Sequence, residues 1–168
     1  MKWKYLAVIA LVIGAILIAS PASAFTAKDL TITVSPAGDA TIDFSYELNW
    51  LEQFAVFAKI ADPAAELKSA LENNFHKTVE VTRADSGEMT VVVHSFASVK
   101  STPSGTEYTT PALSFAEAER VLNSYWFAPL VSPDFSPEVT RVIFPDGSTE
   151  TFENVISIPT ITKTVVTG

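Results

Sequence analysis

The sequence predicts an α+β fold: a two-layer sandwich with a mainly antiparallel sheet built of hairpins and about three helices on one face. Two observations lead to this prediction. Stretches in which apolar and polar residues alternate come in pairs joined by short turns, as in β-hairpins. Stretches with helical periodicity lie between those pairs, so the order is hairpin, two helices, hairpin, helix, hairpin. A chain of 168 residues has the usual size of one domain.

The beginning of the chain is typical of an export signal. Lys2 and Lys4 form a short positive head, and an apolar stretch runs from Leu6 to Ala19. Ala22-Ser23-Ala24 then offers the small residues that a signal peptidase requires. As a helix, the apolar stretch is roughly 21 Å long, short of the roughly 30 Å hydrocarbon core of a bilayer. We therefore expect a secreted or extracytoplasmic protein that works at or near the cell surface.

The expected cleavage site lies after Ala24, which makes Phe25 the new N-terminus. Residues 1–24 are then a signal peptide, and residues 25–168 form a single α+β domain. The alternative is an uncleaved anchor from Tyr5 to Phe25. Contact with a membrane is expected only through such an anchor.

Composition and charge narrow the class of partner. The chain has no cysteine, so it can form neither a disulfide framework nor a lipid-modified cysteine. Its formal net charge is −8, and loss of Lys2 and Lys4 with the leader lowers this to −10. Such a charge disfavours nucleic acid and anionic lipid surfaces. The expected partner is another envelope protein or a second copy of the chain.

The first hairpin has the clearest pattern. Leu30 to Val34 alternates, and a turn follows at Ser35-Pro36-Ala37-Gly38-Asp39. From there the alternation resumes, with apolar residues on one strand face and polar residues on the other, as in a half-buried strand. The apolar set is Ala40, Ile42, Phe44, Tyr46 and Leu48.

Two helices are expected next. The stretch Asn49 to Leu71 begins with a helix that is apolar over more than half of its circumference, beyond the stripe that one sheet face requires. Asp62 and Pro63 are start signals for a second helix, as its N-cap and first helical residue. We expect both helices to cover the apolar faces of the hairpins.

A second hairpin and a third helix follow. Thr78–Arg83 and Met89–Val99 predict the hairpin, and Ser101–Pro111 is expected to be a loop because it has no periodicity. Ser114 and Glu117 form a capping box, which predicts that a helix begins there.

A third hairpin and an edge strand are expected at the end of the chain. Val139–Phe144 and Ser148–Phe152 flank the strong turn sequence Pro145-Asp146-Gly147. Ile156–Val166 is then predicted to be a Thr-rich edge strand, whose pairing is limited by Pro159.

Common catalytic and nucleotide-binding motifs are missing. The sequence has no GxGxxG or GxxxxGK[ST] loop and no GxSxG elbow. His76 at a helix end and His94 within a strand are interpreted as structural, so no transition-metal site is expected. Asp39, Asp43 and Glu47 share a strand face and are interpreted as a solvated row of carboxylates. We expect no cofactor and no catalytic residue. Whether the protein is an enzyme stays open, and a noncatalytic role is favoured.

Two aromatic-rich stretches exceed what the predicted core requires. One is the broad apolar surface of the first helix, and the other runs from Tyr125 to Leu130 beside prolines. Trp and Tyr are frequent at binding hot spots, although large aromatic side chains also fill cores, so both interpretations stay open. The candidate ligand or partner contacts are Trp50, Val56, Phe57, Tyr125, Trp126 and Phe127.

Three functions are compatible with these features. The first is a noncatalytic interaction module of the cell surface or envelope, which uses an apolar patch to hold its partner. The second is a carrier or sensor for a small apolar ligand between helices and sheet, which requires an internal cavity on the order of several hundred Å³. The third is a hydrolase with an unrecognised site, which no residue pattern favours.

Three features give the chain a wider likeness: the leader MKWKYLAVIALVIGAILIASPASA, an acidic Thr-rich remainder without cysteine, and the stretch LTITVSPAGDATIDFSYELNW. In these features it resembles the uncharacterised exported proteins of methanogenic archaea. The resemblance implies no activity. Where such proteins belong to larger architectures, they look like surface-layer or envelope components, which favours the first function.

Overall fold

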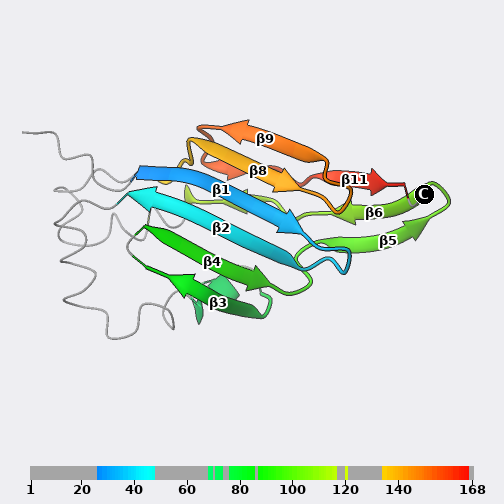
Figure 1. The fold of residues 1–168 in the computed structure, drawn as a ribbon, viewed down its shortest axis with the longest axis horizontal. Coiled ribbons are helices and arrows are strands. Elements are labelled where there is room, and N and C mark those ends of the chain that lie inside the picture. The colour runs from blue at the N-terminus through cyan, green and yellow to red at the C-terminus, as the bar shows by residue number, and fades with distance from the viewer. Residues whose placement is uncertain are drawn as a thin grey trace, which may run out of the picture.

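The computed structural model describes residues 26–47, 68–69, 71–73, 76–85, 87–116, 120 and 134–166. Strands dominate these residues (Figure 1). In chain order they are β1 (Thr26–Val34), β2 (Ala40–Glu47), β3 (Val79–Ala84), β4 (Glu88–Val93), β5 (Ser98–Thr102), β6 (Gly105–Thr109), β7 (Leu113–Ser114), β8 (Val139–Ile143), β9 (Thr149–Glu153), β10 (Ser157–Ile158) and β11 (Thr162–Val165).

The largest sheet has six strands in the order β3-β4-β2-β1-β8-β9 (Figure 1). Every neighbouring pair in it is antiparallel except β1 and β8, which run parallel. The parallel pair joins the hairpins β1–β2 and β8–β9, so Asp29–Thr33 lies beside Val139–Ile143, more than 100 residues later in the chain. The sheet is therefore mainly antiparallel, as the sequence predicts, with one parallel pair that the sequence did not predict.

The first hairpin is confirmed, together with its alternation. Leu30 pairs with Phe44, Ile32 with Ile42 and Val34 with Ala40, and Leu30, Ile32, Val34, Ala40 and Ile42 are buried. The predicted turn closes the hairpin, with a hydrogen bond of 2.9 Å from the Gly38 amide to the Ser35 carbonyl.

The hairpins β3–β4 and β8–β9 are also confirmed. The Pro145-Asp146-Gly147 turn is held by Asp146 Oδ1, which accepts hydrogen bonds from the hydroxyl of Ser148 at 2.6 Å and from its amide at 2.9 Å. These two hydrogen bonds, with the hydroxyl bond first, hold the pKa of Asp146 below its ordinary value. The turn chemistry read from the sequence therefore operates as expected.

The predicted strand Met89–Val99 is wrong at its end. β4 stops at Val93, because His94 and Ser95 form a turn in which Ser95 has a left-handed φ of 52°. The Ser95 amide donates to Asp39 Oδ1 at 2.8 Å, which holds the chain in that turn. His94 consequently lies after the strand and not within it, with Nδ1 3.6 Å from Asp39 Oδ2.

The predicted loop Ser101–Pro111 is wrong as well. β5 and β6 form a tight hairpin there, with Thr102 opposite Gly105. The expected last strand forms as two short strands on either side of Pro159, and β11 lies at the edge of the sheet β11-β6-β5. β5, β6 and β11 contain threonines, which suit a pleated, half-buried surface. Each of these strands, like β10, is too short to show a clear period of two.

The prediction of an α+β sandwich with about three helices is wrong for the structure as described. Only seven described residues are helical: Lys68, Ser69, Leu71, Glu72, Asn73, Ala116 and Arg120. Among the described residues, the two smaller sheets, β11-β6-β5 and β10-β7, contribute side chains to the hydrophobic cluster on the apolar face of the six-stranded sheet. One hydrophobic cluster joins the three sheets, including Ile32, Val91, Val93, Val142, Phe144, Phe96, Tyr108, Leu113, Ile158 and Val165.

Most of the residues assigned to the predicted helices lie outside the described residues. This holds for Asn49–Leu67 and for Glu117 of the capping box. Ser114 itself is the last residue of β7, and its hydroxyl accepts a hydrogen bond of 3.4 Å from the Ala116 amide. The signal peptide of residues 1–24 also falls outside the described part, so it remains a prediction.

Candidate interaction surface

The contact residues proposed from the sequence lie outside the described residues. They are Trp50, Val56, Phe57, Tyr125, Trp126 and Phe127. The residues of the expected cleavage site, Ala24 and Phe25, also lie outside the described part. An aromatic contact patch therefore stays a prediction. The described residues direct attention to a different surface, the outer face of the six-stranded sheet.

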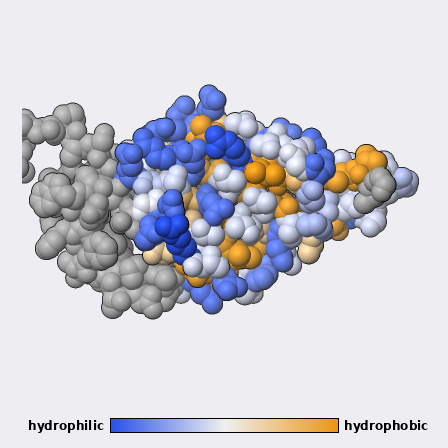
Figure 2. Space-filling model, viewed as in Figure 1, coloured by the Kyte–Doolittle hydropathy of each residue, from blue (hydrophilic) through white to orange (hydrophobic). Residues whose placement is uncertain are grey.

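The outer face carries the polar residues that alternate with the core residues. Strand register aligns Arg141, Thr31, Asp43 and Thr90 in one row that crosses β8, β1, β2 and β4. The opposite, apolar face packs against core residues of the two smaller sheets. Figure 1 shows β5, β6 and β11 extending past one end of the six-stranded sheet. In Figure 2 the outer face is mainly hydrophilic, with small hydrophobic areas between the polar side chains.

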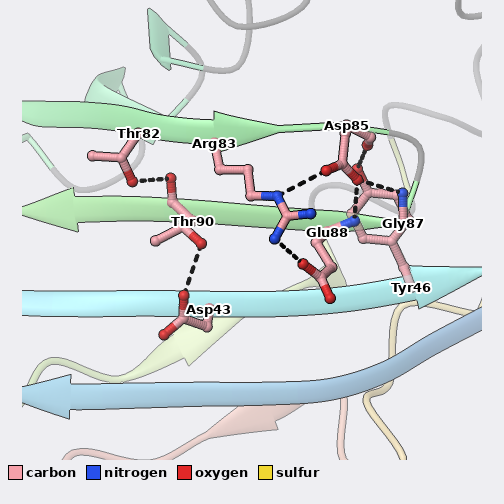
Figure 3. Close-up of polar contacts among 8 residues, drawn as sticks. All are labelled: Asp43, Tyr46, Thr82, Arg83, Asp85, Gly87, Glu88 and Thr90. Carbon is pink, nitrogen blue, oxygen red and sulfur yellow. Dashed lines mark hydrogen bonds and ion pairs between the residues drawn. The ribbon is translucent and has the colours of Figure 1, made fainter.

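Arg83 is held over β4 by two carboxylates (Figure 3). Its Nε lies 2.8 Å from Asp85 Oδ2, and its Nη1 forms an ion pair with Glu88. The same two contacts, with the Asp85 hydrogen bond first, raise the pKa of Arg83. Because more than half of the Arg83 side chain is exposed, these pairs contribute little to stability, but they restrict where the guanidinium points.

Asp85 organises the turn between β3 and β4 (Figure 3). Its Oδ1 accepts hydrogen bonds from the amides of Gly87 at 3.0 Å and Glu88 at 2.9 Å. These backbone hydrogen bonds, followed by the one from Arg83, hold the pKa of Asp85 below its ordinary value. The carboxylate is therefore ionised at neutral pH and fixes both the turn and the arginine.

Tyr46, near the end of β2, fastens the same turn from the neighbouring strand. Its hydroxyl donates to the Asp85 carbonyl at 2.5 Å, and its amide donates to the Gly87 carbonyl at 2.9 Å. Burial, and then the charge of Asp85, raises the pKa of Tyr46, so the phenol keeps its proton at neutral pH. The position of Arg83 is thus set by three strands.

Asp43 lies near the centre of the outer face. Its Oδ1 accepts a hydrogen bond of 2.8 Å from the Thr90 hydroxyl on the adjacent strand (Figure 3). The Thr90 carbonyl in turn accepts one of 3.1 Å from the Thr82 hydroxyl, at the point where the β3–β4 register shifts. These contacts fix the Asp43 carboxylate at one oxygen.

Asp29 and Arg141 form a further ion pair of this face. Arg141 Nη1 lies 3.0 Å from Asp29 Oδ1, across the parallel strand pair. The Asp29 amide donates to the Ser45 hydroxyl oxygen at 3.2 Å, which leaves the Ser45 hydroxyl hydrogen to serve as a donor. The pair balances one carboxylate beside the centre of the face.

A hollow of about 290 Å³ lies among these groups on the outer face. It opens to solvent, and its walls combine carboxylates, hydroxyls and one guanidinium with atoms of Phe44 and Met89. The lining residues whose side chains the strand register places on this face are Asp29, Thr31, Asp43, Ser45, Arg83, Glu88 and Thr90.

A second hollow, of about 530 Å³, lies between the end of the six-stranded sheet and β6. Hydroxyl residues and Lys77 line it, together with Phe96, Ala97 and Pro111. The Lys77 ammonium group donates to the Ser95 carbonyl, so it is already engaged at the rim. Neither hollow is an enclosed apolar chamber. The apolar-ligand hypothesis concerns space beneath the predicted helices, most of which lies outside the described residues, so it stays a prediction.

The sequence reading missed the two arginines of this face. It treated Asp43 as one of a row of solvated carboxylates, and it assigned no role to Arg83 or Arg141. One signal was present, because Arg83 stands two residues before Asp85 in a turn that was predicted correctly. Arg141 gave no such signal, since its partner Asp29 is 112 residues away.

Within the described ranges, no group of three or more His, Asp or Glu residues is arranged to hold a metal ion. In the same part of the chain, no helix has both the length and the apolar character that crossing a membrane requires. The sequence matches no protein-family model, no curated protein and no solved structure.

Proposed function

We propose that the protein is an exported, noncatalytic binding module of the cell surface or envelope. The observation that carries this proposal is the hollow on the outer sheet face, where Arg83 and Asp43 are held in place by neighbouring strands. A side chain that is already positioned loses less conformational entropy when a partner binds. The export leader expected from residues 1–24 supports the location.

The surroundings of the hollow favour binding over catalysis. The carboxylates that surround it face solvent and meet arginine, hydroxyl or amide partners, so no carboxyl group there has the apolar surroundings that keep a general acid protonated at neutral pH. Ion pairs of this kind orient a partner and select against wrong ones, even where they add little affinity. We infer that the outer face provides the contact surface and that the inner face provides stability.

Co-sedimentation tests this function. Full-length purified protein is mixed with an envelope fraction of its source cells, and bound and free protein are quantified over a range of protein concentrations. Saturable binding is expected, with affinity reduced at least about tenfold by Asp43→Asn, because a charged hydrogen-bond acceptor contributes roughly 1.5–3 kcal/mol. Glu107→Gln on β6 is the matched control, since it removes the same charge from a different sheet and is expected to bind normally.

Two results contradict the proposal. One is the absence of saturable binding to the envelope fraction. The other is binding that the Asp43→Asn and Arg83→Ala variants leave unchanged, which would place the contact elsewhere on the chain, including an uncleaved leader.

A further inference from the structure

The chemistry of the outer-face hollow narrows the class of ligand. The argument rests on the proposed function, since it concerns the same surface. It begins with charge. Arg83 is paired with both Asp85 and Glu88, and Arg141 is paired with Asp29, so these five groups together carry about one negative charge. Asp43 adds another, and its described partner is a neutral hydroxyl, so the hollow and its rim keep about two negative charges.

This charge distribution disfavours two classes of ligand. An anion such as a phosphate or a sulfated sugar would meet the surplus charge of Asp43 in a chain of net charge −8. An apolar ligand would have to displace water from carboxylates and guanidinium groups without replacing their hydrogen bonds, which is costly. A cation would be attracted by this charge, but a group that only donates cannot accept from the N–H groups of Arg83. A neutral polar ligand avoids both penalties and can both donate and accept.

The donors and acceptors of the hollow are mixed. Arg83 carries five N–H groups, and its ion pairs use Nε and Nη1. Asp43 accepts one hydrogen bond through Oδ1, and a carboxylate oxygen can accept more than one. Thr31 and Ser45 add hydroxyls on adjoining strands, which lie about 4.8 Å apart. A ligand with neighbouring hydroxyl groups, each of which both donates and accepts, matches this arrangement.

The size of the hollow agrees with a small ligand. Its volume of about 290 Å³ is at the lower end of the roughly 300–1,000 Å³ that is typical of small-molecule sites. We propose that the hollow binds one sugar ring of a neutral carbohydrate, with one sugar hydroxyl donating to Asp43 and its neighbour accepting from Arg83. The protein would thus hold an envelope glycan by one sugar residue at a time.

The test is a titration of the isotope-labelled full-length protein with the methyl glycosides of glucose, galactose, mannose and N-acetylglucosamine, followed by amide chemical shifts. Saturable shifts confined to β1, β2 and β4 around the hollow are expected with at least one glycoside. Asp43→Asn is expected to weaken that binding about tenfold, as for loss of a charged acceptor. Glu107→Gln is expected to bind as the wild type does. Unfolding in urea establishes that both variants are folded.

Three outcomes overturn the inference. In the first, no glycoside shifts the hollow amides at saturating millimolar concentrations. In the second, glucuronate or spermidine shifts them while the neutral glycosides do not, which assigns the hollow to an anion or a cation. In the third, Asp43→Asn and the wild type bind the same glycoside equally well.

The outcome of the glycoside titration can be distinguished from the outcome of the envelope-binding experiment that tests the proposed function. Envelope binding that persists when glycosides neither bind nor compete contradicts the carbohydrate but leaves the binding module in place. Absence of both glycoside binding and envelope binding contradicts the carbohydrate ligand and the binding module alike. Competition of a glycoside against envelope binding supports both together.

Discussion

A backbone hydrogen bond between Ala97 and Gly38 connects the tip of the first hairpin to the segment that leads into β5. The Ala97 amide donates to the Gly38 carbonyl at 2.8 Å, and a Cβ on Gly38 would lie 2.6 Å from the Ala97 carbonyl oxygen. Gly38 also has a φ of +89°, which side-chain-bearing residues rarely adopt. The contact between the six-stranded sheet and β5 thus depends on a residue without a side chain.

Gly38→Ala is therefore expected to lower the free energy of unfolding by on the order of 3 kcal/mol, as a steric clash is added to backbone strain. Gly147→Ala is the matched control, because Gly147 has a φ of +79° in a turn but no atom within 4 Å of the added Cβ. That variant is expected to lose about 1 kcal/mol, from the backbone alone. Urea unfolding measures both, and equal losses would show that the Gly38–Ala97 contact yields easily.

Two buried threonines are expected to respond in opposite directions to replacement by valine. Thr140 Oγ1 is buried and has no hydrogen-bond partner among the described residues. Thr140→Val removes this unsatisfied group and is expected to stabilise the protein by about 1 kcal/mol. Thr110 Oγ1 accepts from the Ile161 amide at 3.3 Å, so Thr110→Val is expected to destabilise by about 1 kcal/mol. Thermal unfolding of both variants checks this, and a loss of stability in Thr140→Val would mean that its hydroxyl has a partner after all.

Asp85 is expected to make stability depend on pH in the acid range. Its folded pKa is lowered from the ordinary value of 3.8, chiefly by the Gly87 and Glu88 amides. A group whose pKa is depressed by folding stabilises the protein above its unfolded pKa, and this stabilisation is lost as pH falls through the folded pKa. Asp85→Asn is thus expected to be less stable than the wild type at pH 7, with a difference that shrinks below about pH 4. Urea unfolding across pH measures it, and a constant difference would contradict the assignment.

Arg83→Lys is expected to separate binding from stability. Lysine keeps the charge but lacks the planar fork that reaches Asp85 and Glu88 together. Because the pairs are exposed, the free energy of unfolding is expected to change little. Binding to the envelope fraction is expected to weaken severalfold, because the variant lacks the guanidinium group that Arg83 holds over the hollow. Lys100→Arg on β5 serves as the control and is expected to change neither quantity.

Local patterns could be predicted where the responsible residues are close in the sequence. The turn at Ser35–Asp39 and the turn at Pro145–Gly147 were both identified, because their conformations depend on Pro, Gly and Asp within a few residues. The alternation correctly placed Ala40 and Ile42 on the buried face and Asp43 on the exposed one. A period of two in hydrophobicity can be recognised within the sequence of a single strand, without knowing its neighbours.

The second layer could not be read in the same way. β5 and β6 have five residues each, and β7 and β10 have two each, so none shows a reliable period. Their threonines and the turn at Pro103–Ser104 are equally typical of a loop. They become strands because pairing with one another and packing against the large sheet satisfies their backbone groups, which is a property of the assembled fold.

The sequence by itself therefore determined the hairpins β1–β2, β3–β4 and β8–β9, their turns and the alternation along the first hairpin. Tertiary structure alone decided the parallel pairing of β1 with β8, the sheet that covers the core, and the hollow on the outer face. The physical reason is the range of the forces involved. Turn conformation and alternation are fixed by neighbours in the chain, whereas Asp29 and Arg141, 112 residues apart, meet only after the whole sheet has formed.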